Sequence, residues 1–155
     1  MIFDAHTHLQ PGGYTGFKDF YQLAVASAPE ECAFLERAAG EDRTLYYACG
    51  VHPWRSATVS VKELLPWFGK ASAIGEIGMD RVWCQVELPI QKAVFQEQLQ
   101  WADRLKKPVI LHTKGCEKEV LDEISGFPHP ILVHWYSSEA YLEGYLDLGC
   151  FFTVG

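Results

Sequence analysis

Short apolar runs alternate along this chain with stretches of helical periodicity, and this alternation restricts the fold more than any other feature of the sequence. Seven apolar runs are expected to form strands, at residues 2–5, 20–26, 45–49, 71–76, 109–111, 131–133 and 151–154. Strands that alternate with helices predict a parallel sheet covered by helices, because parallel neighbours need a crossover connection. Periodicity alone does not separate a closed barrel from an open doubly wound sheet.

The stretches between these runs carry apolar residues at helical spacing. The clearest is 89–107, where Ile90, Val94 and Leu105 lie on one stripe and a proline ends the pattern. The other expected helices run from a capping box at Ser27 and Glu30 to position 40, over 61–68 with an interruption at Pro66, over 120–124, and from Ser138 to Leu148. Residues 11–16, rich in proline and glycine, predict a loop or a shortened helix.

The composition is that of an ordinary globular domain. The chain has 155 residues, 48% hydrophobic and 21% charged, so we expect one domain over residues 1–155. It has no apolar run of about 18 residues and no basic, apolar leader, which predicts no membrane partner and a cytoplasmic protein. Five cysteines without a close pair indicate reduced thiols rather than disulfides or a cysteine-based zinc site.

The formal net charge of −7 argues against a broad nucleic-acid surface, which needs clustered lysine and arginine. The cluster Arg104, Lys106 and Lys107 falls at the end of the expected helix 89–107, where cations favour the helix dipole. An acidic protein can still bind phosphate locally if metal ions supply positive charge.

Four of the expected strands end in residues that can bind metal. These residues are His6 and His8, Glu76, His112 and His134. Parallel strands all end at one face of the sheet, so these side chains can converge there. The spacing of the first two histidines places both rings on the same side of an extended strand. Imidazole and carboxylate ligands suit divalent zinc, manganese or iron.

Each of these residues alone has an ordinary structural explanation, such as a surface histidine pair, a hydrogen-bonded core histidine or a salt-bridged glutamate. Their occurrence at four strand ends together favours a metal centre. His129 precedes its strand instead of following it, so we expect it in a surface loop at the opposite end of the sheet.

Five motifs occur in the order found in the TatD-like metal-dependent hydrolases of the amidohydrolase superfamily. They are IFDAHTHL, ACGVHPW, AIGEIGMD, a glutamine-rich helix followed by KPVILHT, and ILVHWYSS. The chain resembles this family from Met1 to Gly155. The resemblance implies an α/β fold of the TIM-type (β/α)8 barrel class, of which this chain supplies about seven strands. It also implies hydrolase activity, often metal-dependent deoxyribonuclease activity.

The resemblance further implies a centre of one or two divalent ions (Zn, Mn, Mg or Fe). His6, His8 and Glu76 would hold one ion, and Glu76 would bridge to a second ion held by His112 and His134. The ions would lower the pKa of an attacking water and stabilise the developing oxyanion.

Other positions concern the substrate. His52, in the Gly-Val-His-Pro motif, is expected either to contact a phosphate or leaving group or to cap the local backbone. Lys114 stands where the family usually has arginine, and lysine contacts phosphate as a point charge rather than as a fork. Three tryptophans are candidates for the substrate mouth or for packing: Trp54, Trp83 and Trp135.

The family's last strand carries an aspartate that binds metal and accepts the proton of the attacking water. No candidate for it follows the seventh expected strand before Gly155, so we expect roughly 50–70 further residues in a complete barrel. The segment 134–138 also departs from the family's His-Cys-Phe-Ser-Gly pattern. These departures bear on a DNA substrate more than on the metal site.

The leading hypothesis is therefore a divalent-metal hydrolase with a phosphodiester substrate, DNA ends included. The second is a metal-dependent hydrolase of an amide, lactone or ester. The third is a non-catalytic, degenerate barrel, which would apply to a chain that stopped at Gly155. The sequence predicts no particular oligomeric state.

Overall fold

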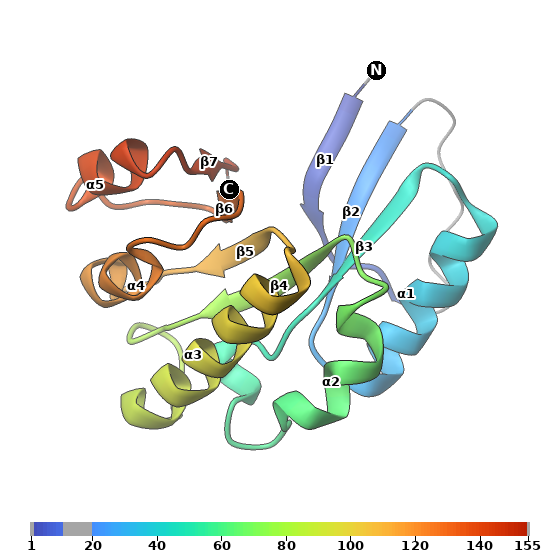
Figure 1. Cartoon of the computed structure of the whole chain (residues 1–155), viewed down its shortest axis with the longest axis horizontal. Coiled ribbons are helices and arrows are strands. Elements are labelled where there is room, and N and C mark those ends of the chain that lie inside the picture. The colour runs from blue at the N-terminus through green and yellow to red at the C-terminus, as the bar shows by residue number, and fades with distance from the viewer. Residues whose placement is uncertain (1, 11–19, 155) are drawn as a thin grey trace.

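The computed structural model describes residues 2–10 and 20–154, and these residues form one parallel sheet with helices outside it (Figure 1). The strands are β1 (Ile2–Thr7), β2 (Phe20–Ala26), β3 (Leu45–Cys49), β4 (Ala73–Gly78), β5 (Val109–His112), β6 (Ile131–Val133) and β7 (Phe151–Phe152). Their order in the sheet equals their order in the chain. A doubly wound sheet reverses its strand order at a switch point, whereas a barrel does not. The predicted barrel class, with seven strands in this chain, is confirmed.

The helices are α1 (Pro29–Glu41), the short 3-10 helix η1 (Pro53–Arg55), α2 (Val61–Phe68), α3 (Leu88–Leu105), α4 (Glu117–Ile124) and α5 (Leu142–Asp147). Helix α2 packs between α1 and α3. The main core lies between this helical layer and the sheet. A smaller cluster, centred on Leu23, Val25 and Ile110, fills the opposite face of the sheet. Successive side chains of a strand therefore point to opposite faces of the sheet, because strand side chains alternate with a period of two residues.

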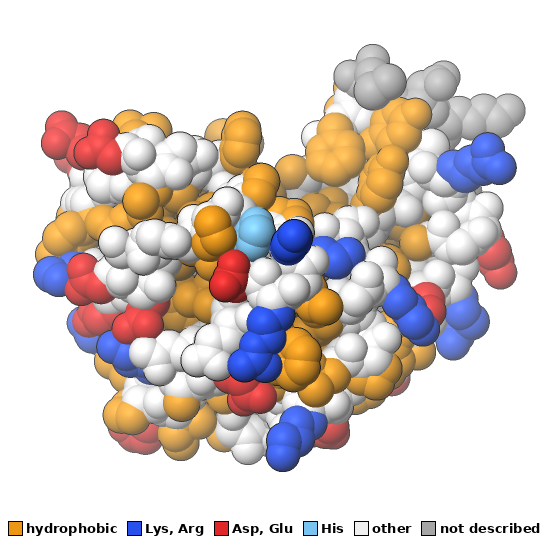
Figure 2. Space-filling view, viewed as in Figure 1, with side chains coloured by type: hydrophobic (Ala, Val, Ile, Leu, Met, Phe, Trp, Pro, Cys, Tyr) orange, Lys and Arg blue, Asp and Glu red, His pale blue; other side chains and the backbone are white. Residues whose placement is uncertain are grey.

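Acidic and basic side chains are interspersed on the face of the molecule shown in Figure 2. On that face the surface is hollowed, with β1 and β2 on one side of the hollow and the region of β7 on the other. Hydrophobic side chains lie on both sides of it (Figure 2). Among the helices in the described part of the chain, none has the length and apolarity required to cross a bilayer.

The start of α1 differs from the expected capping box. Pro29 occupies the first turn as predicted, but the N-cap is Ala28, without a side-chain cap. Glu31, rather than Glu30, reaches back and accepts a hydrogen bond from the Ser27 backbone N–H at 2.8 Å. The predicted pairing is wrong by one residue, because the helix begins one position later than the box required.

Two further helices correct the sequence prediction. Helix α2 continues through Pro66, since the carbonyl that loses its partner belongs to the exposed Lys62, where water can solvate it. Helix α5 does not begin at Ser138, because the left-handed backbone of Tyr141 (φ +64) interrupts the segment and only Leu142–Asp147 is helical. The Ser138 hydroxyl instead accepts a bond from the Ala140 N–H within the preceding turn. The expected connection at 11–16 lies outside the described residues.

Strands β4 and β5 approach each other closely where the polar side chains emerge. Gly78 pairs with His112 in the sheet. Gly78 has a φ of +141, and a Cβ at this position would lie 2.1 Å from the His112 carbonyl oxygen. Only glycine allows this approach. Gly78, two residues after Glu76, thus allows β4, which carries Glu76, to lie close to β5, which carries His112.

Candidate metal centre

The strands deliver the predicted ligands to one end of the sheet, with small shifts from the expected positions. His6 lies within β1 and His8 directly after it, while Glu76 lies inside β4, which continues for two more residues. His112 is the last residue of β5, and His134 follows β6. A pocket of about 620 Å³ opens at this end and is lined by four of these five side chains together with His52 and Lys114.

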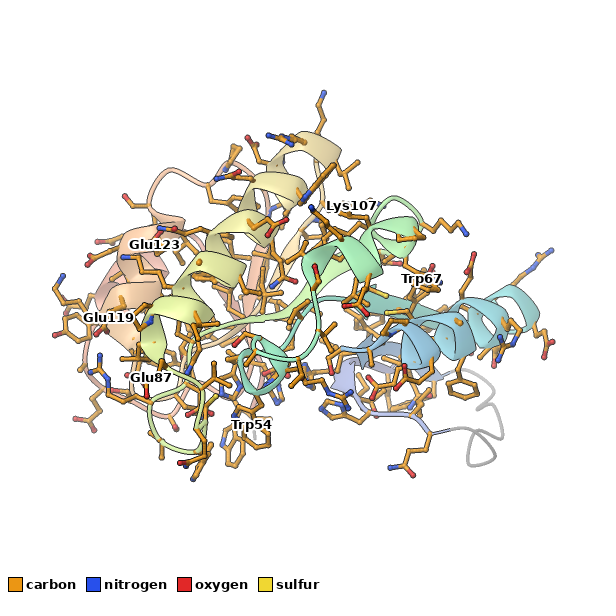
Figure 3. The ribbon with its side chains drawn as sticks, turned by 90° about the horizontal axis from the view of Figure 1, so that it is seen from below. Trp54, Trp67, Glu87, Lys107, Glu119 and Glu123 are labelled. Carbon is orange, nitrogen blue, oxygen red and sulfur yellow. The ribbon has the colours of Figure 1, made fainter. Side chains whose placement is uncertain are left out.

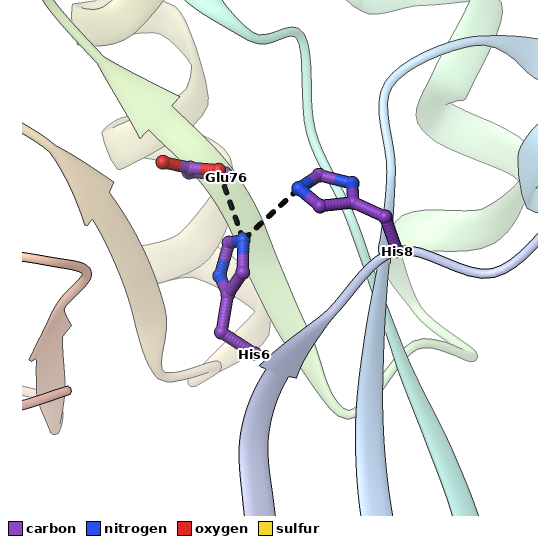
Figure 4. A group of neighbouring side chains, drawn as sticks. All are labelled: His6, His8 and Glu76. Carbon is purple, nitrogen blue, oxygen red and sulfur yellow. Dashed lines mark hydrogen bonds and ion pairs between the residues drawn. The ribbon is translucent and has the colours of Figure 1, made fainter. Parts of the chain in front are cut away.

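The first cluster contains His6, His8 and Glu76 (Figure 4). The His6 Nε2 atom lies 3.2 Å from Glu76 Oε2 and 3.3 Å from His8 Nε2. One ring proton on His6 cannot serve both contacts, and His6 Nδ1 is buried without a hydrogen-bond partner among the described residues. A divalent cation accepts lone pairs from all three atoms, so the donor set fits a metal ion better than a hydrogen-bond network.

The second cluster contains His52, Glu76 and His112. Glu76 Oε1 lies 2.9 Å from His112 Nδ1, and Glu76 Oε2 lies 4.0 Å from His52 Nε2. Glu76 therefore faces the first cluster through one oxygen and His112 through the other. This geometry fits a carboxylate shared between two ions.

His134 lies beside these clusters and belongs to neither of them within the described part of the chain. Its ring stacks on that of His6, with centroids 3.5 Å apart and planes at 9°. Its Nδ1 contacts the Thr153 hydroxyl at 2.8 Å. Burial lowers the pKa of His134 to about 4, so the ring is neutral at pH 7, as a metal ligand must be.

Burial and hydrogen bonds also set the charges of the other residues. Burial alone would raise the pKa of Glu76, but bonds with His112 and His6 hold it well below its usual range. Burial would lower the pKa of His112, yet the contacts with Glu76 and Asp80 raise it. Burial lowers the pKa of His52 to about 4. The centre therefore presents an ionised carboxylate beside a neutral His52.

Asp80 is a site residue that sequence reasoning missed. Its side chain is fully buried, and its Oδ2 lies 2.9 Å from His112 Nε2 and accepts a bond from Trp54 Nε1 at 2.6 Å. Its Oδ1 accepts the backbone N–H groups of Val82 and Trp83, both at 2.8 Å. The signal was present in the AIGEIGMD motif, because Glu76, Gly78 and Asp80 are spaced by two and therefore share one side of an extended chain.

His52 and Lys114, the two residues predicted to contact the substrate, both form contacts within the protein. His52 Nδ1 accepts the Trp54 backbone N–H at 3.2 Å, which is the expected local cap, while its Nε2 points toward Glu76. The Lys114 ammonium is largely buried and donates to the Trp135 carbonyl and to the Ser137 hydroxyl. Both residues line the pocket, and Lys114 also orders the loop after β6. His129 lies in the loop before β6, on the far side, where its Nε2 contacts Asp103.

A curved parallel β/α sheet with imidazoles and a carboxylate gathered at the carboxyl ends of its strands is the architecture of the barrel-type metal-dependent hydrolases. The family model described as "TatD related DNase" matches residues 3–155, and the chain belongs to this family.

Individual relatives agree with this assignment. The chain is 29% identical over 163 residues to an uncharacterized metal-dependent hydrolase, TatD, of Mycobacterium tuberculosis, covering 88% of this chain and 61% of the relative. It is 36% identical over 156 residues to an uncharacterized metal-dependent hydrolase of Methanocaldococcus jannaschii, covering 90% and 61%. The crystal structure of the TatD homologue YjjV from Escherichia coli K12 superposes with a TM-score of 0.77 at 25% identity, covering 87% of this chain and 55% of that one. The chain thus spans little more than half the length of these relatives.

Proposed function

We propose that the complete protein hydrolyses phosphodiester bonds at a centre of one or two divalent ions. His6, His8 and Glu76 hold the first ion. A second ion would be held by Glu76 together with the imidazoles of His112 and the adjacent His134. The observation that carries this proposal is the position of Glu76, whose Oε2 faces His6 at 3.2 Å and whose Oε1 faces His112 at 2.9 Å.

A bound divalent ion supplies positive charge for a phosphate and lowers the pKa of a water. The protein's own residues prepare the site for this chemistry. Asp80 fixes the ring of His112 through Nε2, which leaves Nδ1 directed toward Glu76. His52 keeps a neutral ring at the pocket wall, and because its Nδ1 accepts the Trp54 N–H, its Nε2–H can donate a hydrogen bond to a substrate oxygen or a water.

A phosphodiester is the preferred substrate for two reasons. The matching family model is described as a DNase. In addition, a human protein named 3'-5' RNA nuclease TATDN2 is 39% identical over 62 residues, covering 39% of this chain and 8% of that protein. Positive charge for the phosphate comes from the ions and the Lys114 region rather than from a broad basic surface, which matches the net charge of −7.

The test is the substitution His6→Ala in the full-length protein. We expect bound metal, measured by elemental mass spectrometry, to fall, and hydrolysis of oligonucleotides to drop more than about 100-fold, since even residues behind the ligands contribute 10- to 100-fold. His129→Ala, on the far side of the sheet, is the matched control and should change neither quantity. Full metal content in His6→Ala would refute the ligand assignment.

A substrate panel tests the bond that is broken. Phosphodiesters, carboxylic esters, lactones and cyclic amides are offered to the same metal-loaded protein. Turnover of phosphodiesters is the expected result, and turnover confined to the carbon esters, lactones or amides would overturn the proposal.

A further inference from the structure

We propose that Trp83 and Trp135, called here the tryptophan pair, form a stacking platform for an unpaired nucleobase next to the phosphate that enters the pocket. This inference rests on the proposed function and adds to it a specificity-determining subsite. The two residues come from different loops, one after β4 and the other after β6. Both line the pocket that contains Glu76 and His112.

The tryptophan pair is exposed, although large aromatic side chains are normally buried. The indole centroids are 6.1 Å apart and the planes meet at 29°. Trp83 is 50% exposed and Trp135 46% exposed. Trp54, from η1, adds a third half-exposed indole to the same pocket wall. A group of half-exposed aromatic side chains at the wall of a pocket that contains several ionisable groups is typical of a ligand site rather than of packing.

Buried charged residues hold the tryptophan pair in place. Asp80 accepts the backbone N–H of Trp83. The Lys114 ammonium donates to the backbone carbonyl of Trp135 and lies 4.4 Å from the centroid of its ring. The Trp135 N–H donates to the Thr153 hydroxyl at 3.0 Å. These contacts fix the backbones, and the two indoles stay about half exposed beside each other, so the platform is ordered before a ligand arrives.

The backbone of Trp135 supports a functional explanation. Its φ is +46, in the left-handed region that bulky residues seldom adopt. Such a conformation is strained and is typical of binding and catalytic loops. Here it places the indole in the pocket wall, where the residue remains 46% exposed.

The other two tryptophans show what a packing role looks like in this protein. Trp67 and Trp101 pack against the main core. The Trp67 indole donates to Glu36 at 2.9 Å, between α1 and α2, and Figure 3 shows it well away from Trp54. Tryptophans in this chain are therefore either packed on the core or gathered at the pocket.

A nucleobase is the planar group that suits this platform. In a nucleic acid every phosphate has a base within a few bonds, so a phosphate bound by ions at the proposed metal centre would bring a base to the pocket wall. Stacking on aromatic side chains is worth about 1–3 kcal/mol per base and tolerates any base sequence. A base must be unpaired to stack on the platform.

The experiment measures binding of two hydrolysis-resistant phosphorothioate tetranucleotides to the full-length, metal-loaded protein by calorimetry. One carries thymine bases and the other is abasic. The protein should bind the thymidylate ~5- to 150-fold more tightly. Trp83→Ala and Trp135→Ala should each remove at least ~5-fold of that preference and leave the abasic ligand unaffected, while Trp135→Tyr should restore part of it.

Trp67→Phe is the matched control and should leave both affinities unchanged. Equal binding of the two tetranucleotides by the unsubstituted protein, or an equal loss for both in the alanine variants, would overturn the inference. Cleavage of the phosphodiester forms is measured separately. Cleavage without base preference would reject the platform and keep the proposed function, whereas base preference without cleavage would do the reverse.

Discussion

Asp80 has more bearing on the candidate site than any other residue outside the metal-ligand set. Its two oxygens contact four groups, namely the indole N–H of Trp54, the ring of His112, and the backbone N–H groups of Val82 and Trp83. Those bonds outweigh the effect of burial and lower its pKa. Asp80 therefore links the candidate metal ligands to the aromatic wall of the pocket.

We expect Asp80→Asn to destabilise the protein by about 1–3 kcal/mol. One carboxylate oxygen is replaced by an NH2 group, which cannot accept hydrogen bonds from the donors that face it. Hydrolysis should fall about 10- to 100-fold as the ring of His112 loses its fixed orientation. Urea unfolding and steady-state rates measure the two effects. Asp122→Asn, on the surface beside Lys118, should stay within about 0.5 kcal/mol, and a similar small change at Asp80 would contradict the expected role.

At the scale of single elements, the sequence predicted every strand but placed several helix ends incorrectly. The clearest case is the capping box. Ser60 and Glu63 form one at the start of α2, with Glu63 accepting the Ser60 N–H at 2.7 Å and Ser60 accepting the Lys62 N–H at 3.3 Å. The predicted box at Ser27 does not form. Both segments carry the same short pattern, Ser-x-x-Glu, so this pattern alone does not decide which serine becomes a cap.

Ser60→Ala should lower the free energy of unfolding by about 1 kcal/mol, the usual contribution of an N-cap hydroxyl. Ser27→Ala is the comparison, and it should cost less than about 0.5 kcal/mol, because the Ser27 hydroxyl has only a long contact of 3.4 Å with Glu31. Chemical denaturation of both variants gives the difference. An equal cost at the two positions would show that the hydroxyl of Ser60 does not stabilise α2.

At the scale of the whole molecule, residues from β1, β4, β5 and β6 meet at one pocket, and the metal-free site is costly. It places several imidazoles and two ionised carboxylates, Glu76 and Asp80, close together in a partly buried site. Ligands that bind only the folded state stabilise it in proportion to the logarithm of their concentration. Metal binding should therefore couple to folding.

Adding Mn²⁺ or Zn²⁺ to the chelator-stripped, full-length protein should raise its Tm by about 5–10 °C at 100 times the dissociation constant, which corresponds to about 2.7 kcal/mol. Differential scanning calorimetry measures the shift. His6→Ala should lose most of it and His129→Ala should keep it. A shift of the same size in His6→Ala would place the ion elsewhere.

The residue pattern was enough to predict the alternation of parallel strands and helices and the identities of the candidate ligands, whereas the barrel class came from the family resemblance and the observed strand order. The spacing of apolar residues follows from the local geometry of helices and strands. A ligand at the end of a strand can be predicted from the sequence, because parallel strands all end at the same face of the sheet. The five predicted residues His6, His8, Glu76, His112 and His134 do lie at that face.

How those residues group depends on long-range packing. The contact of Glu76 with His6 on one side and His112 on the other depends on the register of β4 against β5, which Gly78 permits through its close approach to His112. The roles of Asp80 and of the tryptophan pair depend on loops that meet only when the sheet curves. Such contacts join residues far apart in the chain, and a local sequence pattern carries no information about the distance between them.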